Sequence, residues 1–320
     1  MTNHTTFIGI DISKNYLDVH FLQSNKRLRL ENSKAGCGQL RKYLAKLPCP
    51  VVGLEASGGY ERQVLRRLTA AGFDTYCLDP AQVHAYSRSR GQRAKTDAID
   101  AEMIARCLRQ NHETLRPYAH DPATEELAEL VAFRATLVKH AAKLACRIEQ
   151  ARLAMIVRML KAQRRQIKAR IVLINKTIAD IIASSATLTQ KVKILRSMPG
   201  VGPVLGFTLL ARLPELGILD GRKIAALCGL APFARQSGKS KRPGRCQAGR
   251  RDIRSVLYMA ALSAMRMKSH PLTKFAERLK ADSKPFKVVI TAVMHKMIIM
   301  LNAMLRNNKN WKADMSKQTA

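Results

Sequence analysis

The alternation of apolar and polar positions in the first 110 residues predicts short strands and helices that follow one another. Apolar runs predict strands at 7–10, 17–22, 27–30, 51–54 and 74–78. Longer stretches with helical periodicity predict helices at 38–47, 61–71 and 96–108, the last with Thr96 as its N-cap. Three strands followed by alternating helices and strands favour a mixed α/β layer fold.

The middle of the chain has a different pattern. Residues 121–185 contain one proline, Pro122, and no glycine, and they are rich in Ala, Leu, Ile, Lys, Arg and Gln. This composition predicts two long helices that form an antiparallel hairpin or a coiled coil. A structural role, as a scaffold or dimerisation stalk, is a better interpretation of this segment than a role in catalysis or binding.

A third segment begins near Lys191. The turn MPGVGP at 198–203 opens an apolar helix at 204–213, and the free backbone N–H groups of such a turn suit a phosphate. Its shape resembles helix-hairpin-helix DNA-binding turns, with an ordinary tight interhelical turn as the alternative. Further helices are predicted at 251–267 and 287–305. The latter is interrupted by His295, Lys296 and Asn302, which favours a packed amphipathic helix over a membrane span.

Charge narrows the class of partner. The 320 residues include 56 Lys and Arg against 23 Asp and Glu, a net charge of +33, yet 47% of the residues are hydrophobic. Such a globular but strongly basic chain favours nucleic acid as its partner. Residues 191–320 hold 26 basic and six acidic side chains, a net of +20, so the strongest binding surface is expected there. Seven scattered cysteines without a C-x-x-C pair argue against a zinc ribbon or a secreted disulfide framework, and no signal peptide is recognisable at the N-terminus.

Four acidic residues stand where strands end or where a helix begins. Asp11 and Glu55 each end a predicted strand, and Asp97 and Asp100 lie one helical turn apart. Carboxylates at the tips of apolar strands cost desolvation unless a cation pairs with them. Each acid alone has an ordinary explanation, a strand-end turn or a favourable helix dipole. Together they predict a site for one or two Mg²⁺ ions, which can stabilise the attacking and leaving oxygens of a phosphoryl transfer.

A second candidate site lies in the basic stretch 222–254, which has ten basic residues and Asp252 as its one acid. It contains a predicted loop at 235–242. Ser237 precedes Gly238, whose missing side chain lets a phosphate approach closely, whereas Ser240 lies between two lysines. The cations predicted to bind nucleic acid are Arg235, Lys239, Lys241, Arg242, Arg245, Arg250 and Arg251.

Five sequence motifs, in order, carry a family resemblance. They are GIDISKNYLDV, GLEASGGYERQ, AKTDAIDAEMIA, SMPGVGPVLGFTLLA and AALCGLAPFARQSGKSKRPGRCQAGRRDIR. The chain resembles transposases of the IS110/IS1111 insertion-sequence family over nearly its whole length, and its acids resemble those of RNase H-like Holliday junction resolvases. The resemblance implies an RNase H/RuvC-like DEDD domain at 1–115, a helical coiled-coil segment at 116–190, a mainly helical transposase domain at 191–310 and a disordered tail at 311–320.

The resemblance also implies a chemistry. Asp11, Glu55, Asp97 and Asp100 fall on the family's acidic tetrad, which implies Mg²⁺. Ser237 falls on a serine held to form a covalent phosphoserine link to DNA, with Ser240 as the alternative nucleophile. The implied function is transposition by site-specific recombination of donor and target DNA, guided by a structured non-coding (bridge) RNA, in the bacterial cytoplasm at the nucleoid. Because the serine and the acids lie in different domains, a composite site is expected in a homo-oligomer, a dimer that becomes a tetramer in the synaptic complex.

Three other functions compete with this interpretation. A hydrolytic junction resolvase would need only the acids and water, and a basic Ser-Gly loop argues against it. A kinase of the actin-like ATPase fold would need a second Asp-Gly phosphate loop and an adenosine motif, and we recognise neither in the sequence. A non-catalytic nucleic-acid-binding protein would leave the four acids unexplained.

Overall fold

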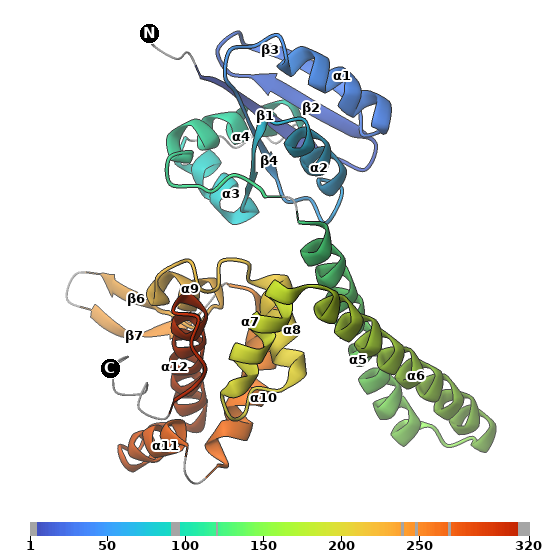
Figure 1. Ribbon diagram of the computed structural model, residues 1–320, viewed down its shortest axis with the longest axis vertical. Helices are drawn as coiled ribbons and strands as arrows, with labels where there is room; N and C mark the ends of the chain where they lie inside the picture. The colour runs from blue at the N-terminus through green and yellow to red at the C-terminus, as the bar shows by residue number, and fades with distance from the viewer. Residues whose placement is uncertain are drawn as a thin grey trace. The chain divides into compact units, whose positions relative to one another are not determined.

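The computed structural model describes residues 5–90, 97–119, 121–237, 240–246, 249–267 and 270–312 (Figure 1). Contacts between residues divide the chain into two compact units, Met1–Asp121 and Pro122–Ala320. In the described residues, the first unit is built on a five-stranded sheet, and the second is helical apart from a two-stranded hairpin.

The sheet of the first unit has the strand order β3-β2-β1-β4-β5. β1 and β2 pair antiparallel, as do β2 and β3, whereas β1 pairs parallel with β4 and β4 with β5. The strands are β1 (Thr6–Ile12), β2 (Tyr16–Phe21), β3 (Lys26–Glu31), β4 (Pro50–Glu55) and β5 (Asp74–Leu78). The predicted mixed α/β layer is therefore confirmed.

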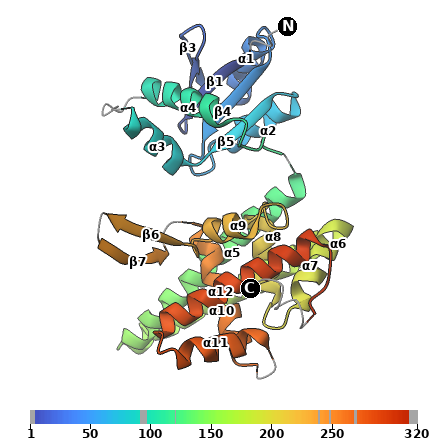
Figure 2. The same ribbon diagram turned by 90° about the vertical axis from the view of Figure 1, so that its left-hand side faces the viewer.

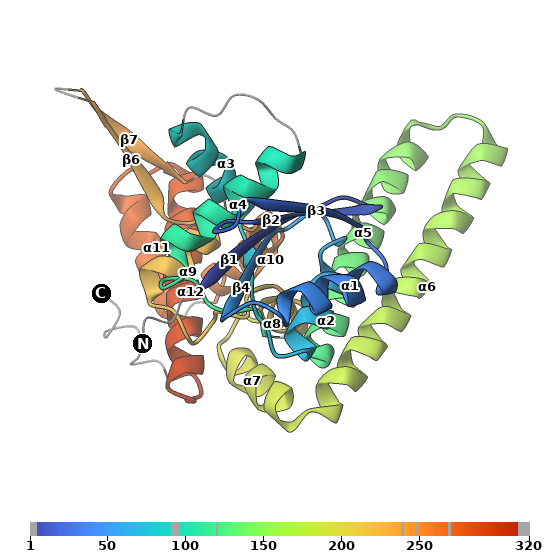
Figure 3. The same ribbon diagram turned by 90° about the horizontal axis from the view of Figure 1, so that it is seen from above.

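Helices cover both faces of this sheet (Figure 3). α1 (Lys34–Leu44) and α2 (Arg62–Ala70) pack on one face, and α3 (Pro80–Ser89) and α4 (Asp97–Asn111) on the other. α3 is absent from the sequence-based prediction, which places no helix between the strand at 74–78 and the helix at 96–108. Asp79 accepts a hydrogen bond from Ala81 N at 2.8 Å, and Pro80 takes the first helical position, so the same dipeptide begins a helix. The expected N-cap of α4, Thr96, lies outside the described residues.

Two glycines let α4 lie directly on the sheet. Gly9 of β1 and Gly53 of β4 are register partners. A Cβ atom at Gly9 would lie 2.0 Å from the Ala101 carbonyl oxygen, and one at Gly53 would lie 2.9 Å from Leu108 Cδ2. Any side chain at Gly9 would therefore push the helix away from the central strands.

The second unit begins with two long helices, α5 (Pro122–Gln150) and α6 (Ala154–Ser184), which pack along each other. The buried side chains on them include Leu137 and Leu144, and Ile167 and Ile174, each pair seven residues apart. The predicted long helices are confirmed, and a coiled coil stays a prediction that this spacing favours. These buried residues belong to the same apolar core as the helices that follow.

That core is completed by α7 (Ala186–Ser197), α8 (Pro203–Arg212), α9 (Gly221–Leu227), α10 (Arg251–Met265), α11 (Pro271–Ala281) and α12 (Phe286–Arg306). By length and composition α12 could cross a membrane. It has ten buried residues, however, and packs against α7, α9, α10 and α11 (Figure 2). The prediction of a packed helix is confirmed.

The start of the predicted C-terminal tail is packed against this unit. Trp311 stacks on His270 with ring centroids 5.5 Å apart, and its backbone N–H donates to Ser197 Oγ at 2.7 Å. Residues 313–320 lie outside the described residues.

The predicted loop at 235–242 is a β-hairpin. β6 (Pro232–Ser237) pairs antiparallel with β7 (Ser240–Cys246), and the hairpin extends from the helices (Figure 2). Residues 238 and 239, between the strands, are not described. The polar sequence resembles a loop because a two-stranded ribbon buries little and needs no alternation of apolar positions.

Candidate active site

Asp11 is the next-to-last residue of β1 and Glu55 is the last residue of β4, and these two adjacent strands run in the same direction. β1 and β4 are parallel, and their last register partners are Ile10 and Leu54, so the next residue on each strand is Asp11 and Glu55. Neighbouring positions of a parallel pair point to the same face of a sheet. The register therefore brings these two carboxylates together at the carboxyl edge, as the sequence predicts.

Helix α4 covers the face that carries the two acids. Phe7 of β1 packs with α3 and α4, and Asp11 is on the same side of its strand because it is four residues further along. Asp100 precedes Ala101, whose carbonyl oxygen contacts Gly9. Asp100 thus lies at the end of α4 that rests on β1 near Asp11. Sequence periodicity alone does not determine this placement, because it depends on the glycines beneath the helix.

Asp97 is the first residue of α4, but its side chain is outside the described part of the structure. Among the described residues, no three His, Cys, Asp or Glu side chains are grouped closely enough to hold a metal ion. Asp11, Glu55 and Asp100 are all partly buried and offer carboxylate oxygens, the ligand type that Mg²⁺ prefers. Their chemistry therefore fits a divalent cation, with Asp97 as the fourth predicted ligand.

A fifth acid on this face is missing from the sequence-based prediction. Asp18 of β2 is the register partner of Asp11, and its side chain is only 14% exposed. Arg29 of β3, its own register partner, places Nε 3.7 Å from Asp18 Oδ1. Directly opposed residues of antiparallel strands share a face. The signal in the sequence is the second acid of GIDISKNYLDV, seven positions after the first.

The loop that follows Glu55 is held by another carboxylate, Glu61. Its Oε2 accepts hydrogen bonds from Ser57 N at 3.1 Å, Ser57 Oγ at 3.2 Å and Gly59 N at 2.8 Å. Gly58 and Gly59 have φ angles of 75° and 117°, which favour glycine. This loop geometry fixes the chain just beyond Glu55, and it explains the Ser-Gly-Gly sequence followed by a glutamate.

Asn32 connects the loops that follow the two acidic strands. Its Nδ2 donates to the carbonyl oxygen of Ser13, after β1, at 2.9 Å and to that of Tyr60, after β4, at 3.3 Å. A side chain with two amide hydrogens can bridge two carbonyl groups in this way. Asn32 and Glu61 are thus positioning residues around the acids, and neither lies in a periodic pattern that sequence reasoning could have singled out.

The two candidate nucleophiles lie at paired backbone positions of the hairpin. Ser237 ends β6, Ser240 begins β7, and they are register partners. Arg235 is likewise the partner of Arg242. Lys241 is the partner of Gln236 and Arg245 that of Phe233, whereas Lys239 lies outside the described residues.

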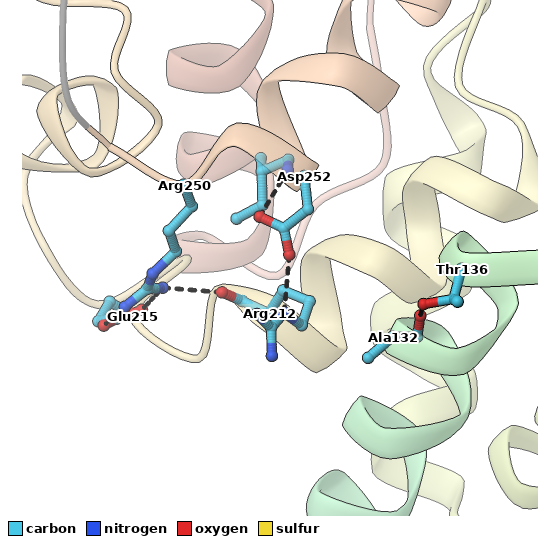
Figure 4. A network of polar contacts seen from close by, with 7 residues as sticks. Ala132, Thr136, Arg212, Glu215, Arg250 and Asp252 are labelled. Atoms are coloured by element: carbon cyan, nitrogen blue, oxygen red, sulfur yellow. Dashed lines mark hydrogen bonds and ion pairs between the residues drawn. The ribbon is translucent and has the colours of Figure 1, made fainter. Parts of the chain in front are cut away.

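A network of ion pairs holds the start of α10, which follows the hairpin in the chain, against the end of α8 (Figure 4). Arg250 donates to both carboxylate oxygens of Glu215, at 2.7 and 2.6 Å, and to the Arg212 carbonyl oxygen at 2.8 Å. Burial disfavours the charged guanidinium, but Glu215 outweighs this and raises the pKa of Arg250. These contacts occupy several hydrogen-bond donors of Arg250, and phosphate binding by this residue stays a prediction. Arg251 is the first residue of α10 and is exposed.

Arg212 forms the second ion pair of this network. Its Nε donates to Asp252 Oδ2 at 2.8 Å. Burial works against the charged form of Asp252, but the hydrogen bond and charge of Arg212 prevail and lower the pKa of Asp252. The network joins the end of α8 to the first turn of α10 and thereby fixes the position where α10 begins.

The turn before α8 packs against a helix. Gly200 has a φ angle of 90°, and a Cβ atom there would lie 3.0 Å from Ala264 Cβ of α10. Residues 205–211 of α8 are all buried. The phosphate-binding role predicted for this turn stays a prediction, and its glycine serves helix packing.

Two parts of the chain match models of known protein families. Residues 8–156 match the DEDD domain of IS110 transposases, described as "Transposase". Residues 192–277 match a domain described as "Transposase IS116/IS110/IS902 family". The first match contains all four predicted acids, and the second contains the hairpin with Ser237.

Relatives extend over almost the full chain. The pilin gene-inverting proteins of Moraxella bovis and Moraxella lacunata are each 26% identical, over 315 and 322 residues, and cover 95% of this chain and 97% of their own length. A protein of Sinorhizobium fredii named as a transposase is 25% identical over 351 residues, with 98% of this chain and 87% of the relative covered. With both domain matches in the same order as in the sequence motifs, the chain belongs to the IS110 family of transposases.

Proposed function

We propose that this transposase cuts and rejoins DNA through a covalent bond between Ser237 and a DNA phosphate. Asp11, Glu55, Asp97 and Asp100 hold Mg²⁺ in this proposal, and the cations of the hairpin bind the DNA backbone. The observation that carries it is the sheet register, which brings Asp11 and Glu55 to the same edge beneath α4 in a chain of the IS110 family.

The proposed reaction conserves the number of phosphodiester bonds. Ser237 Oγ loses its proton and bonds to phosphorus, and the bond from phosphorus to one deoxyribose oxygen breaks, with a proton taken up by that oxygen. A DNA hydroxyl then attacks the phosphoserine and releases Ser237. A bound Mg²⁺ supplies charge stabilisation for the phosphate oxygens. A serine hydroxyl is a weak nucleophile at neutral pH and needs a base or a bound metal ion to activate it for this step.

The proposed partners are donor DNA, target DNA and a structured non-coding guide RNA. Base pairing by the RNA would supply sequence choice, while a strongly basic protein recognises the shape and backbone of nucleic acid. We further propose that the chain works as a homo-oligomer, a dimer that forms a tetramer with both DNAs, in the bacterial cytoplasm at the nucleoid.

Trapping the intermediate tests the nucleophile. Wild-type protein incubated with Mg²⁺, guide RNA and a nicked suicide DNA should give a protein–DNA adduct on a denaturing gel, and peptide mapping should place it on Ser237. Ser237→Ala should bind DNA normally but form no adduct and no recombinant. Ser240→Ala is the matched control, because the two serines are register partners, and it should lose only part of its activity.

Two outcomes would contradict this assignment. An adduct on Ser240, or one that persists in Ser237→Ala, would show that Ser237 is not the nucleophile. Cleavage by the wild type without any adduct, with products that carry only hydrolysed ends, would support the junction-resolvase alternative instead.

A further inference from the structure

The second unit contains a large groove that the proposed chemistry does not use. Its volume is about 1300 Å³, and it is lined by residues from the base of the β6–β7 hairpin, from α11 and from α12. Small-molecule pockets usually measure roughly 300–1,000 Å³. This groove therefore suits an extended ligand better than a metabolite.

The groove is lined by positive charge without acidic partners. Lys274 and Arg278 come from α11, and Lys287 and Lys296 from α12. No Asp or Glu occurs among the described residues that line it, and none of these four cations has an ion pair in the described part of the chain. Such clustering costs free energy through repulsion, which a polyanion would relieve. The charge pattern thus indicates an anionic partner with several charges.

The groove also offers surfaces for flat apolar groups. Arg278 Cζ and Lys296 Nζ lie 5.4 and 5.0 Å from the centroid of the Phe275 ring, within cation–π distance. Val288, which also lines the groove, is 51% exposed. Aromatic and apolar side chains among cations bind the bases and phosphates of single strands. A duplex presents mainly phosphates and sugars outside its grooves and would leave the exposed Val288 side chain without an apolar contact.

We propose that this groove binds one unpaired strand of nucleic acid, with phosphates at the four cations and bases against Phe275 and Val288. The inference rests on the proposed nucleic-acid chemistry of the chain but not on the identity of the nucleophile. Pro232 and Gly244 of the hairpin base line the same groove. A bound strand therefore runs beside the segment that carries Ser237.

Fluorescence anisotropy tests the proposal with full-length protein and a labelled strand of about 20 thymidines, long enough for the site sizes of single-strand grooves. The assay contains EDTA, so that no cleavage occurs. Lys274→Gln/Arg278→Gln should reduce the slope of log affinity against log salt by about 1.4, because each lost phosphate contact contributes about 0.7 for a single strand. The matched control, Lys280→Gln/Lys284→Gln, removes two exposed charges outside the groove and should leave the slope within about 0.3 of the wild-type value.

A second variant tests the apolar wall. Val288→Glu places an acid at an exposed groove position, so the fold should be preserved, and affinity should fall at least about tenfold. Phe286→Glu is its control, since Phe286 is exposed at 49% on the same helix and does not line the groove. An oligouridine of equal length and a matched duplex DNA, used as competitors, distinguish RNA, single-stranded DNA and duplex.

The results separate this inference from the proposed function. Wild-type affinity and slope in all groove variants, or equal competition by the duplex, would overturn the groove assignment even if the Ser237 adduct forms. Weakened binding in the groove variants supports it even if no adduct forms. Weakened self-association of these variants, without any change in strand binding, would instead identify the groove as a contact between copies of the chain.

Discussion

The acidic and basic regions of this transposase are held in place by different means. Asp11 and Glu55 end central strands whose neighbouring residues, such as Ile10 and Leu54, are completely buried. The hairpin with Ser237 is a two-stranded ribbon, and at its base Cys246 Sγ donates to the Leu230 carbonyl oxygen at 3.3 Å. Isolated ribbons are marginally stable in water. In the proposed chemistry, metal ligands need a fixed geometry, which a packed sheet provides, whereas the proposed nucleophile must meet a DNA phosphate and can lie on an element that adapts to it.

The largest expected effect is on the acidic edge. Asp11→Asn removes a charge and a proposed metal ligand with little change in volume, so strand cleavage should fall at least about 10³-fold, while the unfolding transition stays in place. A gel assay of cleavage with Mg²⁺ measures this. Asp74→Asn is the control and should keep full activity. Asp74 is an exposed acid at the amino end of β5, whereas Asp11 and Glu55 lie at the carboxyl ends of their strands. Equal loss in both variants would mean that general charge matters and not the acidic edge.

The next largest effect concerns the support of that edge. Gly9→Ala introduces a Cβ atom against the backbone of α4 and should cost about 3 kcal/mol of unfolding free energy, the upper end of overpacking effects. Gly38→Ala, in α1, has open space around the new Cβ atom and should stabilise by about 0.5–1 kcal/mol. Urea unfolding followed by far-UV circular dichroism measures both. Similar stability of the two variants would show that α4 is not pressed against β1.

A smaller effect is expected at the base of the hairpin. Glu215→Gln breaks the bidentate ion pair with Arg250 and should cost about 1–2 kcal/mol of unfolding free energy. The side chains of Arg250 and Glu215 are 33% and 25% exposed. The single tryptophan, Trp311, lies in this unit, so its fluorescence reports the unit's unfolding. Lys223→Gln breaks the exposed pair with Asp220, 3.9 Å apart, and should leave the unfolding transition unchanged because solvent screens this pair. Reversed costs would contradict the anchoring role of Arg250.

The smallest effect is a dependence of stability on pH in the first unit. Burial lowers the pKa of His20 below its ordinary 6.5, with Glu102 opposing and Arg27 assisting. The unfolded chain therefore binds the proton more readily, and the stability contributed by neutral His20 is present above about pH 6.5 and lost as the pH falls below it. Urea unfolding should be measured between pH 7.5 and 5, which bracket an ordinary histidine pKa of about 6.5. As the pH falls, the free energy of unfolding should decrease less in His20→Leu than in the wild type. An unchanged slope would exclude His20 as the source.

Much of the first unit was predictable because its signals are local. Strands such as Val51–Leu54 are short apolar runs between turn residues, and acids at their ends interrupt the pattern visibly. Helix α3 was missed because Asp79-Pro80 signals both an end and a start. The contributions of Glu61 and Asn32 were also missed, since hydrogen bonds between separate loops leave no periodic trace in a sequence.

The sequence by itself determined the five strands of the first unit, the long helices, the acidic and serine motifs and the family. Each of these depends on local periodicity or on residues close together in the chain. Only the tertiary structure decided that Gly9 lets α4 rest on β1 with Asp100 near Asp11, that the serine segment is a ribbon, and that cations of α11 and α12 gather around Phe275. These arrangements depend on contacts between residues distant in sequence, and the free energy of such contacts is defined only when the chain is packed.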